Sequence, residues 1–150
     1  MSKTHKLKDI DITRNGVRLH IDTDRLERNL NNAQYALDSR VMTDMIPFMP
    51  MQSGMLVEET VGQSASLAGS GEVIAGAGPY GRFLYYGKVM VGVISNSPVA
   101  MKDEKKRPTQ KSLVFATDKH PAARAFWFEE AKKRHKDEWI DLVRKEMYKR

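Results

Sequence analysis

Apolar residues recur at helical spacing through residues 24–46, and this repeat limits most strongly how the chain can fold. The recurring positions, three or four residues apart, are Leu26, Leu30, Ala33, Leu37, Val41 and Met45. They fall on one face of an α-helix of about five or six turns, and that face must pack against another element. Thr23 or Asp24 can cap this helix. Pro47 and Pro50 end it, because a proline disfavours helix in the preceding residue and has no N–H to donate.

An Asn15-Gly16 pair predicts a β-hairpin over about residues 8–22. Apolar and polar residues alternate on both sides of the pair, and Asn-Gly tolerates the positive φ angles of a type I′ turn. We expect the hairpin to bury one face, formed by Ile10, Ile12, Val17, Leu19 and Ile21.

Residues 51–117 are predicted to hold short strands separated by turns that are rich in glycine. The expected strands are Val57–Val61, Glu72–Ala77, Lys88–Ile94 and Leu113–Phe115. Residues 62–71 and 95–112 are expected to be exposed loops, and the aromatic segment Tyr80–Gly87 favours a short helical turn or bend.

A second long helix is predicted over about residues 121–149, entered through Pro121. The order of hairpin, helix, short strands and helix favours an α+β fold, in which two long helices pack on one face of an antiparallel sheet. Strands and helices do not alternate, which argues against a doubly wound fold. The length of 150 residues is that of a single domain, so we expect residues 1–150 to form one.

The positive charge of the chain is concentrated in its last third. Residues 102–150 carry 15 basic and 9 acidic side chains, whereas residues 1–101 carry 10 of each. This asymmetry fits a surface that meets nucleic acid or an acidic protein, and it also fits a helix that is simply well solvated. The absence of cysteine excludes disulfides and thiolate metal sites and fits a reducing cytoplasm. There is no apolar run of roughly 18 residues and no signal peptide, so we expect no membrane association.

No pattern of catalytic, metal-ligating or cofactor-binding residues is present, so we expect no enzyme and no cofactor. The four histidines are His5, His20, His120 and His135, and no two are spaced to share a metal site on a helix. The segment Gly76–Gly81 only superficially resembles a phosphate-binding loop, because Pro79 removes an N–H that a phosphate would need.

Aromatic residues gather at two places and indicate an interface. Phe126, Trp127 and Phe128 would span about 200° of helix and cannot all face one core. They pack either within the domain or against a neighbouring subunit, and the same alternatives hold for Tyr80, Phe83, Tyr85 and Tyr86. Stacking on nucleic acid is a weaker alternative, since only Arg82 and Lys88 supply charge there.

Three motifs, in order over residues 47–136, resemble those of minor capsid proteins of tailed bacteriophages. The first is the Pro-x-x-Ser-Gly-x-Leu turn of residues 50–56. The second is the segment Tyr80–Val91, with its Tyr-Tyr-Gly-Lys-Val-Met-Val string, and the third is Pro108-Thr109 with Leu113, followed by Ala125–Glu129 and Lys132. The chain departs from the family pattern at Ser53, where many relatives have threonine, and over residues 93–106, where the family varies in length.

This resemblance implies an α+β structural protein of the virion at the head–tail junction, assembled in the cytoplasm of the bacterial host. It implies a ring, commonly six-fold, between head-closure (stopper) proteins and tail-terminator or tail-tube proteins. The expected subunit interface comprises Tyr80, Phe83, Tyr85, Tyr86, Lys88, Phe126, Trp127 and Phe128. The residues expected to face the lumen, and DNA that passes without sequence specificity, are Lys102, Lys105, Lys106 and Arg107. The alternative is a DNA-binding module that uses the basic residues of 102–150.

Overall fold

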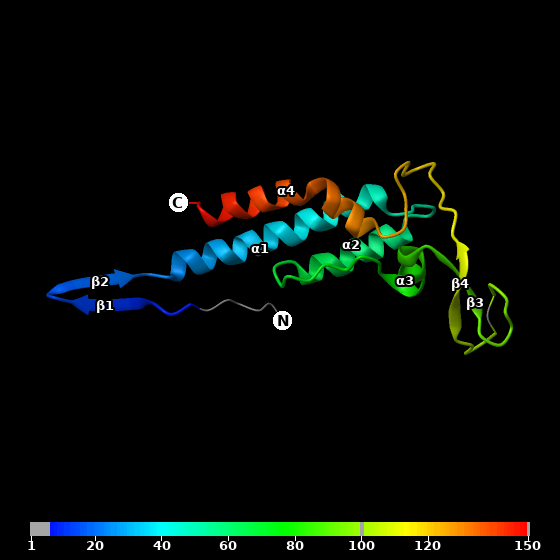
Figure 1. Cartoon of the computed structure of the whole chain (residues 1–150), viewed down its shortest axis with the longest axis horizontal. Coiled ribbons are helices and arrows are strands. Elements are labelled where there is room, and N and C mark those ends of the chain that lie inside the picture. Colours follow the sequence, from blue (N-terminus) through cyan, green and yellow to red (C-terminus); the bar gives the residue numbers. More distant parts are fainter. Residues whose placement is uncertain (1–6, 100, 150) are drawn as a thin grey trace.

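A computed structural model describes residues 7–99 and 101–149 as an elongated arrangement of helices with a small sheet at each end (Figure 1). The elements in chain order are β1 (Ile10–Arg14), β2 (Val17–Ile21), α1 (Asp24–Met45), the 3-10 helix η1 (Ile46–Phe48), α2 (Met55–Leu67), α3 (Gly78–Tyr86), β3 (Lys88–Gly92), β4 (Lys106–Ser112) and α4 (Trp127–Met147). Helices α1 and α4 lie side by side, and α2 runs along α1 (Figure 1).

The core lies where α1 and its continuation η1 meet α4. Its buried residues are Val41, Met42, Met45, Phe48, Met49, Trp127, Ala131 and Trp139. A buried carboxylate joins the two long helices, because Asp44 Oδ2 accepts hydrogen bonds from Trp139 Nε1 at 2.7 Å and from Arg40 Nε at 2.9 Å. Both long helices of the sequence analysis are therefore present, and they pack on each other.

The α+β class and the antiparallel pairing are confirmed, but the strands do not form one sheet. β1 pairs only with β2, and β3 pairs only with β4, so the described strands make two separate two-stranded sheets. The long helices therefore cover each other, and the sheets extend from the ends of the helical body (Figure 1).

The strand predicted at Val57–Val61 is wrong, because these residues lie inside α2, which also takes up the first part of the loop predicted at 62–71. Polar residues of this segment serve a buried helix face instead. Thr60 and Ser64, one helical turn apart, are buried, and their hydroxyls receive the backbone N–H of Ala77 at 2.9 Å and of Ile74 at 3.1 Å. The second expected strand, Glu72–Ala77, is therefore irregular backbone held by side chains of α2 rather than by a neighbouring strand.

The loop predicted at 95–112 contains β4, and the strand predicted at Leu113–Phe115 is irregular. The prolines of the segment had suggested a loop, but Pro108 opposes Met90 beside a register irregularity of a two-stranded sheet, where a proline is tolerated. Thr109 Oγ1 donates a hydrogen bond to the carbonyl of Val89 at 2.8 Å, so a side chain supplements the ladder.

Helix α4 begins at Trp127 rather than near residue 121. Phe126, directly before it, has φ 52° and ψ 45°, which is left-handed backbone that cannot continue a helix. The amides before the helix bond to other elements, since Arg124 N–H donates to the Phe48 carbonyl at 3.0 Å and Phe126 N–H to the Tyr85 carbonyl at 2.8 Å.

The β1–β2 hairpin is present with the predicted Asn15-Gly16 turn, but its expected burial is wrong. Its five aliphatic side chains share one face and are 42–69% exposed. The hairpin projects beyond the start of α1, away from the helical body (Figure 1). The alternation thus predicts the pairing and the apolar face correctly, while nothing in the described part of the chain covers that face.

Two glycine-to-alanine substitutions should have opposite effects on stability. Gly87 ends α3 with φ 62°, and a Cβ there would lie 2.6 Å from Ala125 Cβ. Gly87→Ala should therefore cost at least about 1–2 kcal/mol of the free energy of unfolding. Gly62 lies inside α2 with open space around it, so Gly62→Ala should add about 1 kcal/mol. Urea unfolding measures both, and equal effects of the two substitutions would contradict this description.

Candidate functional site

Helix α3 directs its aromatic residues to three different surroundings. Tyr85 turns toward the start of α4, where its ring meets that of Trp127. Phe83 and Tyr86 line a hollow beside β3, and Tyr80 lies on a groove beside α2. Residues close together in the sequence therefore serve a core contact and two separate surfaces, as helical spacing requires.

An aromatic cluster runs from the core to the surface where α3 meets α4. The ring of Tyr85 packs edge-on against Trp127, with centroids 4.8 Å apart, and against Phe126 at 5.6 Å. The ring of Tyr86 continues the cluster, 5.7 Å from Phe126. Trp127 is fully buried, whereas Tyr86 and Phe126 are 52% and 45% exposed. The rings of Tyr86 and Phe126 are therefore exposed at the surface, where they pack on the ring of Tyr85, which in turn packs on Trp127 beneath it.

Hydrogen bonds hold Trp127 and Tyr85 in position. The indole N–H of Trp127 donates to the carbonyl of Ala75, and the Tyr85 hydroxyl donates to Glu129. Burial, reinforced by the Glu129 carboxylate, raises the pKa of the Tyr85 phenol above its ordinary value, so it remains a donor at physiological pH. The third residue of the motif, Phe128, stacks on Trp139 instead.

The glycines of 76–81 allow α3 to pack closely on the segment before it. A Cβ on Gly81 would lie 2.5 Å from the carbonyl carbon of Gly76, and one on Gly76 would lie 3.2 Å from the Trp127 ring. These glycines therefore serve a close backbone approach, which is a structural use of a pattern that resembled a phosphate loop.

Two hollows flank α3. The smaller, of about 250 Å³, is lined by Arg82, Phe83, Tyr86, Lys88, Met90 and Pro108. It brings together three of the residues predicted for an interface, Phe83, Tyr86 and Lys88. The larger, which we call the α2–α3 groove, has about 500 Å³ and is lined by Met51, Met55, Leu56, Glu59, Tyr80, Leu84, Val114 and Phe115, among others. This groove was not predicted from the sequence, although Met55 and Glu59 lie one helical turn apart in α2.

The β3–β4 connection is ordered by one carboxylate. Glu104 accepts hydrogen bonds from the backbone N–H groups of Ile94, Ser95 and Met101 at 2.6–2.7 Å and from the Ser95 hydroxyl at 2.9 Å. These bonds lower the pKa of Glu104 to about 2. From the sequence this segment was expected to be an exposed loop, with no role for Glu104.

The four residues expected to face a lumen lie on this connection and on β4. Lys106 Nζ donates to the Pro98 carbonyl at 2.8 Å, and an Arg107 guanidinium N–H donates to Asn96 Oδ1 at 2.6 Å. Lys102 and Lys105 are exposed. Two of the four cations thus brace the loop, and two point to solvent.

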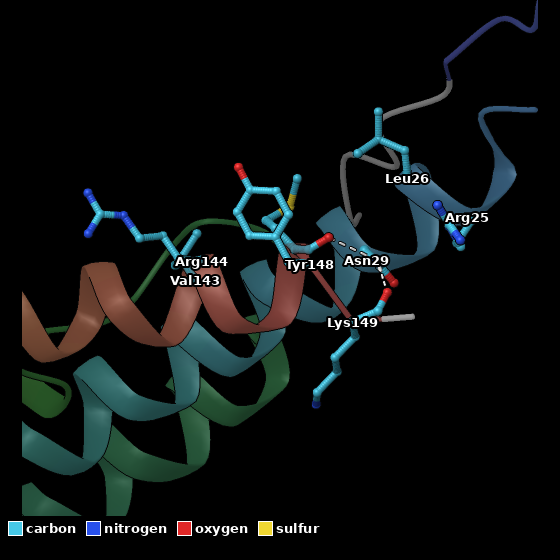
Figure 2. A pocket seen from close by; sticks show the side chains of 8 residues that line it. Arg25, Leu26, Asn29, Val143, Arg144, Tyr148 and Lys149 are labelled. Carbon is cyan, nitrogen blue, oxygen red and sulfur yellow. Dashed lines mark hydrogen bonds between the residues drawn. The ribbon is translucent and has the colours of Figure 1, made fainter. Parts of the chain in front are cut away.

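A third hollow lies where the end of α4 meets the start of α1, close to the hairpin (Figure 2). Asn29 Nδ2 donates to the carbonyls of Met147 and Lys149 at 3.0 and 2.9 Å, which satisfies groups that the end of a helix leaves open. Arg25, Arg144 and Lys149 surround the hollow and make it basic.

Two clusters of three acidic or histidine side chains occur in the described residues, and both have structural partners. Asp44, His135 and Glu138 lie within 4.8 Å of one another, but Arg40 bridges Asp44 and Glu138 at 2.9 Å each. In the second cluster, of Asp9, Asp22 and Asp24, Asp9 accepts hydrogen bonds from Thr23. The first cluster joins α1 to α4, and the second fastens the base of the hairpin to the residue before α1.

A family model for minor capsid proteins matches residues 15–147, which include β2 and every element from α1 to α4. The chain belongs to this family of phage minor capsid proteins. No curated protein and no solved structure matches the chain. Among the described residues of this minor capsid protein, no helix is both long and apolar enough to cross a membrane. The family assignment supports a structural role in the virion and agrees with the resemblance carried by the three sequence motifs.

The loop of this minor capsid protein should depend on the Glu104 carboxylate. Because the pKa of Glu104 is lowered from about 4.5 to about 2, its ionised form stabilises the loop above about pH 4.5. That contribution is lost as the pH falls toward 2. The amide chemical shifts of Ile94, Ser95 and Met101 should therefore change across this range.

Glu104→Gln should speed hydrogen exchange at the same amides at neutral pH, because it removes the charged acceptor. Asp103→Asn is the matched control, since it removes the neighbouring charge from an exposed residue in left-handed backbone that asparagine tolerates. Equal exchange in the two variants would refute the role of Glu104.

Proposed function

We propose that this minor capsid protein is part of the neck of a tailed phage. There it forms a ring, six-fold to match the tail, at the head–tail junction that joins the DNA-filled capsid to the tail. The supporting observation is the aromatic cluster, in which the partly buried Tyr85, packed on the buried Trp127, contacts the exposed rings of Tyr86 and Phe126. Rigidly held, exposed aromatic side chains are typical of the centre of protein–protein interfaces.

The proposed subunit interface uses the surfaces on both sides of α3. Tyr86 and Phe126 form one side, together with Phe83 and Lys88 of the small hollow. Tyr80, 66% exposed, stands on the other side. Tyr85 and Trp127 contribute indirectly, because the Tyr85 ring packs against both exposed rings and against Trp127. Phe128 stacks on Trp139 instead and contributes to packing within α4.

The β3–β4 loop is proposed to face the DNA channel of the ring. Lys102 and Lys105 would meet the phosphates of passing DNA, and Lys106 and Arg107 would hold the loop in shape. Such contacts are weak, independent of sequence and sensitive to salt. The neighbours above and below the ring would be head-closure (stopper) proteins and tail-terminator or tail-tube proteins.

The alternative, a DNA-binding module of residues 102–150, is less well supported because four of its cations, Arg124, Arg134, Arg144 and Lys149, are internally paired. Glu130 lies 2.7 Å from Arg134 and 3.1 Å from Arg124, and the hydrogen bond from Arg134 lowers the pKa of Glu130. Arg144 pairs with Asp141 within α4, and Lys149, just after the end of the helix, pairs with Glu146. These paired cations leave α4 with less free charge to offer DNA than the sequence count suggests.

A stop codon in this gene of the parent phage tests the connector role. Electron microscopy of the lysate should show filled heads and separate tails with few joined particles. Normal, intact virions would contradict the proposal. Retention of duplex DNA by the purified protein, with a steep dependence on salt, would instead favour the DNA-binding alternative.

The exposed rings should be needed for assembly rather than for folding. Tyr86→Ser should leave the unfolding midpoint nearly unchanged and lower the number of joined particles, because the side chain is half exposed. Tyr35→Ser removes a ring of similar exposure from α1 and serves as the control. If the two variants give equal numbers of joined particles, Tyr86 does not belong to the interface.

A further inference from the structure

The β1–β2 hairpin carries an apolar face that its own chain leaves uncovered. The pairs Ile10–Ile21, Ile12–Leu19 and Arg14–Val17 put five aliphatic residues and Arg14 on the same face. The opposite face is polar, with Asp11 paired to His20 and Thr13 to Arg18. Aliphatic side chains that are 42–69% exposed along a whole sheet face indicate a binding surface.

The hairpin is fastened to α1 at its base, so its face has a defined direction. The backbone N–H and the hydroxyl of Thr23 both donate to Asp9 Oδ1 at 3.0 Å. These bonds lower the pKa of Asp9 and join the residue before β1 to the residue before α1. The hairpin therefore extends the line of α1 instead of folding back (Figure 1).

A surface of matching character lies at the other end of α1. The α2–α3 groove is lined mainly by apolar side chains, and its rim residues Met55 and Val114 are 62% and 97% exposed. The 22 residues of α1 span about 33 Å and separate the hairpin from this groove. The hairpin of a chain therefore cannot fill the groove of that same chain.

Charge favours this groove over the hollow near the hairpin. Arg14 lies on the apolar face and Glu59 lines the groove, and neither forms an ion pair with another residue of 7–99 or 101–149. The hollow at the start of α1 offers Arg14 no carboxylate, because its charged lining residues are Arg25, Arg144 and Lys149, of which the last two already pair with Asp141 and Glu146.

We infer that the apolar face of the β1–β2 hairpin docks into the α2–α3 groove of a second copy of this chain, with Arg14 beside Glu59. The two surfaces differ and lie at opposite ends of α1, so the contact is head-to-tail. A head-to-tail contact repeats from copy to copy and closes into a ring when the rotation allows. The inference rests on the proposed self-assembly and assigns the surfaces that make it.

Disulfide cross-linking in purified virions tests this contact. The chain has no cysteine, so Leu19→Cys with Met55→Cys introduces one pair, at two exposed positions of the proposed interface. Mild oxidation should give a ladder of multimers of this chain on a non-reducing gel, and reduction should return it to monomer. A ladder is expected because each copy offers both surfaces, whereas a two-fold contact would stop at dimers.

Matched controls locate the contact. Thr13→Cys with Met55→Cys places the thiol on the polar face of the hairpin and should give no ladder. Leu19→Cys with Tyr148→Cys probes the basic hollow, and a ladder there would overturn the inference. If Leu19→Cys prevents particle formation, Val17→Cys with Val114→Cys replaces the first pair. Joined virions in which both groove pairs leave the chain monomeric would overturn the docking and leave the connector role standing.

Charge reversal gives an independent result. Arg14→Glu in the Leu19→Cys, Met55→Cys background should abolish the ladder, because it puts two carboxylates together. Adding Glu59→Lys to the same chain should restore it. A ladder unaffected by Arg14→Glu would show that Arg14 does not face Glu59 and would contradict the proposed docking position.

Discussion

The burial of Trp127 is the contact on which the rest of the structure depends. Trp127 is the first residue of α4, and its ring packs on the Tyr85 ring of α3 and on Gly76 in the segment before α3. Its indole N–H donates a hydrogen bond to the Ala75 carbonyl. The start of α4 is thereby fixed against α3 and the segment that precedes α3, about 40 residues earlier in the chain. The surface rings of Tyr86 and Phe126, which carry the proposed interface, both pack on the Tyr85 ring that Trp127 holds in place.

The elements with strong local signals were predictable from the sequence. Helical periodicity and the prolines after it placed α1, and Asn15-Gly16 placed the hairpin turn, because these features act within a few residues. Helix α2 was not predictable from the sequence, because Thr60 and Ser64 favour strand or loop by themselves. In the folded protein their hydroxyls accept hydrogen bonds from the backbone of Ala77 and Ile74. Tertiary contacts there override local preference.

The sequence indicates which residue types form the candidate site, but not which of them are buried and which are exposed. Helical spacing indicates that neighbouring aromatics diverge, yet it does not say that Trp127 is inside and Phe126 outside. That difference arises from the left-handed backbone of Phe126, whose N–H bonds to Tyr85. The hairpin shows the same limit, because alternation predicts an apolar face but not whether it is covered by the same chain or by another one.

The chain belongs to a family of phage minor capsid proteins, and its proposed role requires neighbours that bind the surfaces held on its helical body. Cryo-electron microscopy of the neck of intact virions tests this most directly. We predict a ring of copies of this chain at the head–tail junction, with the paired helices α1 and α4 recognisable and the β3–β4 loops toward the DNA channel. Density for the chain elsewhere in the capsid shell, with a neck made of other proteins, would contradict the account.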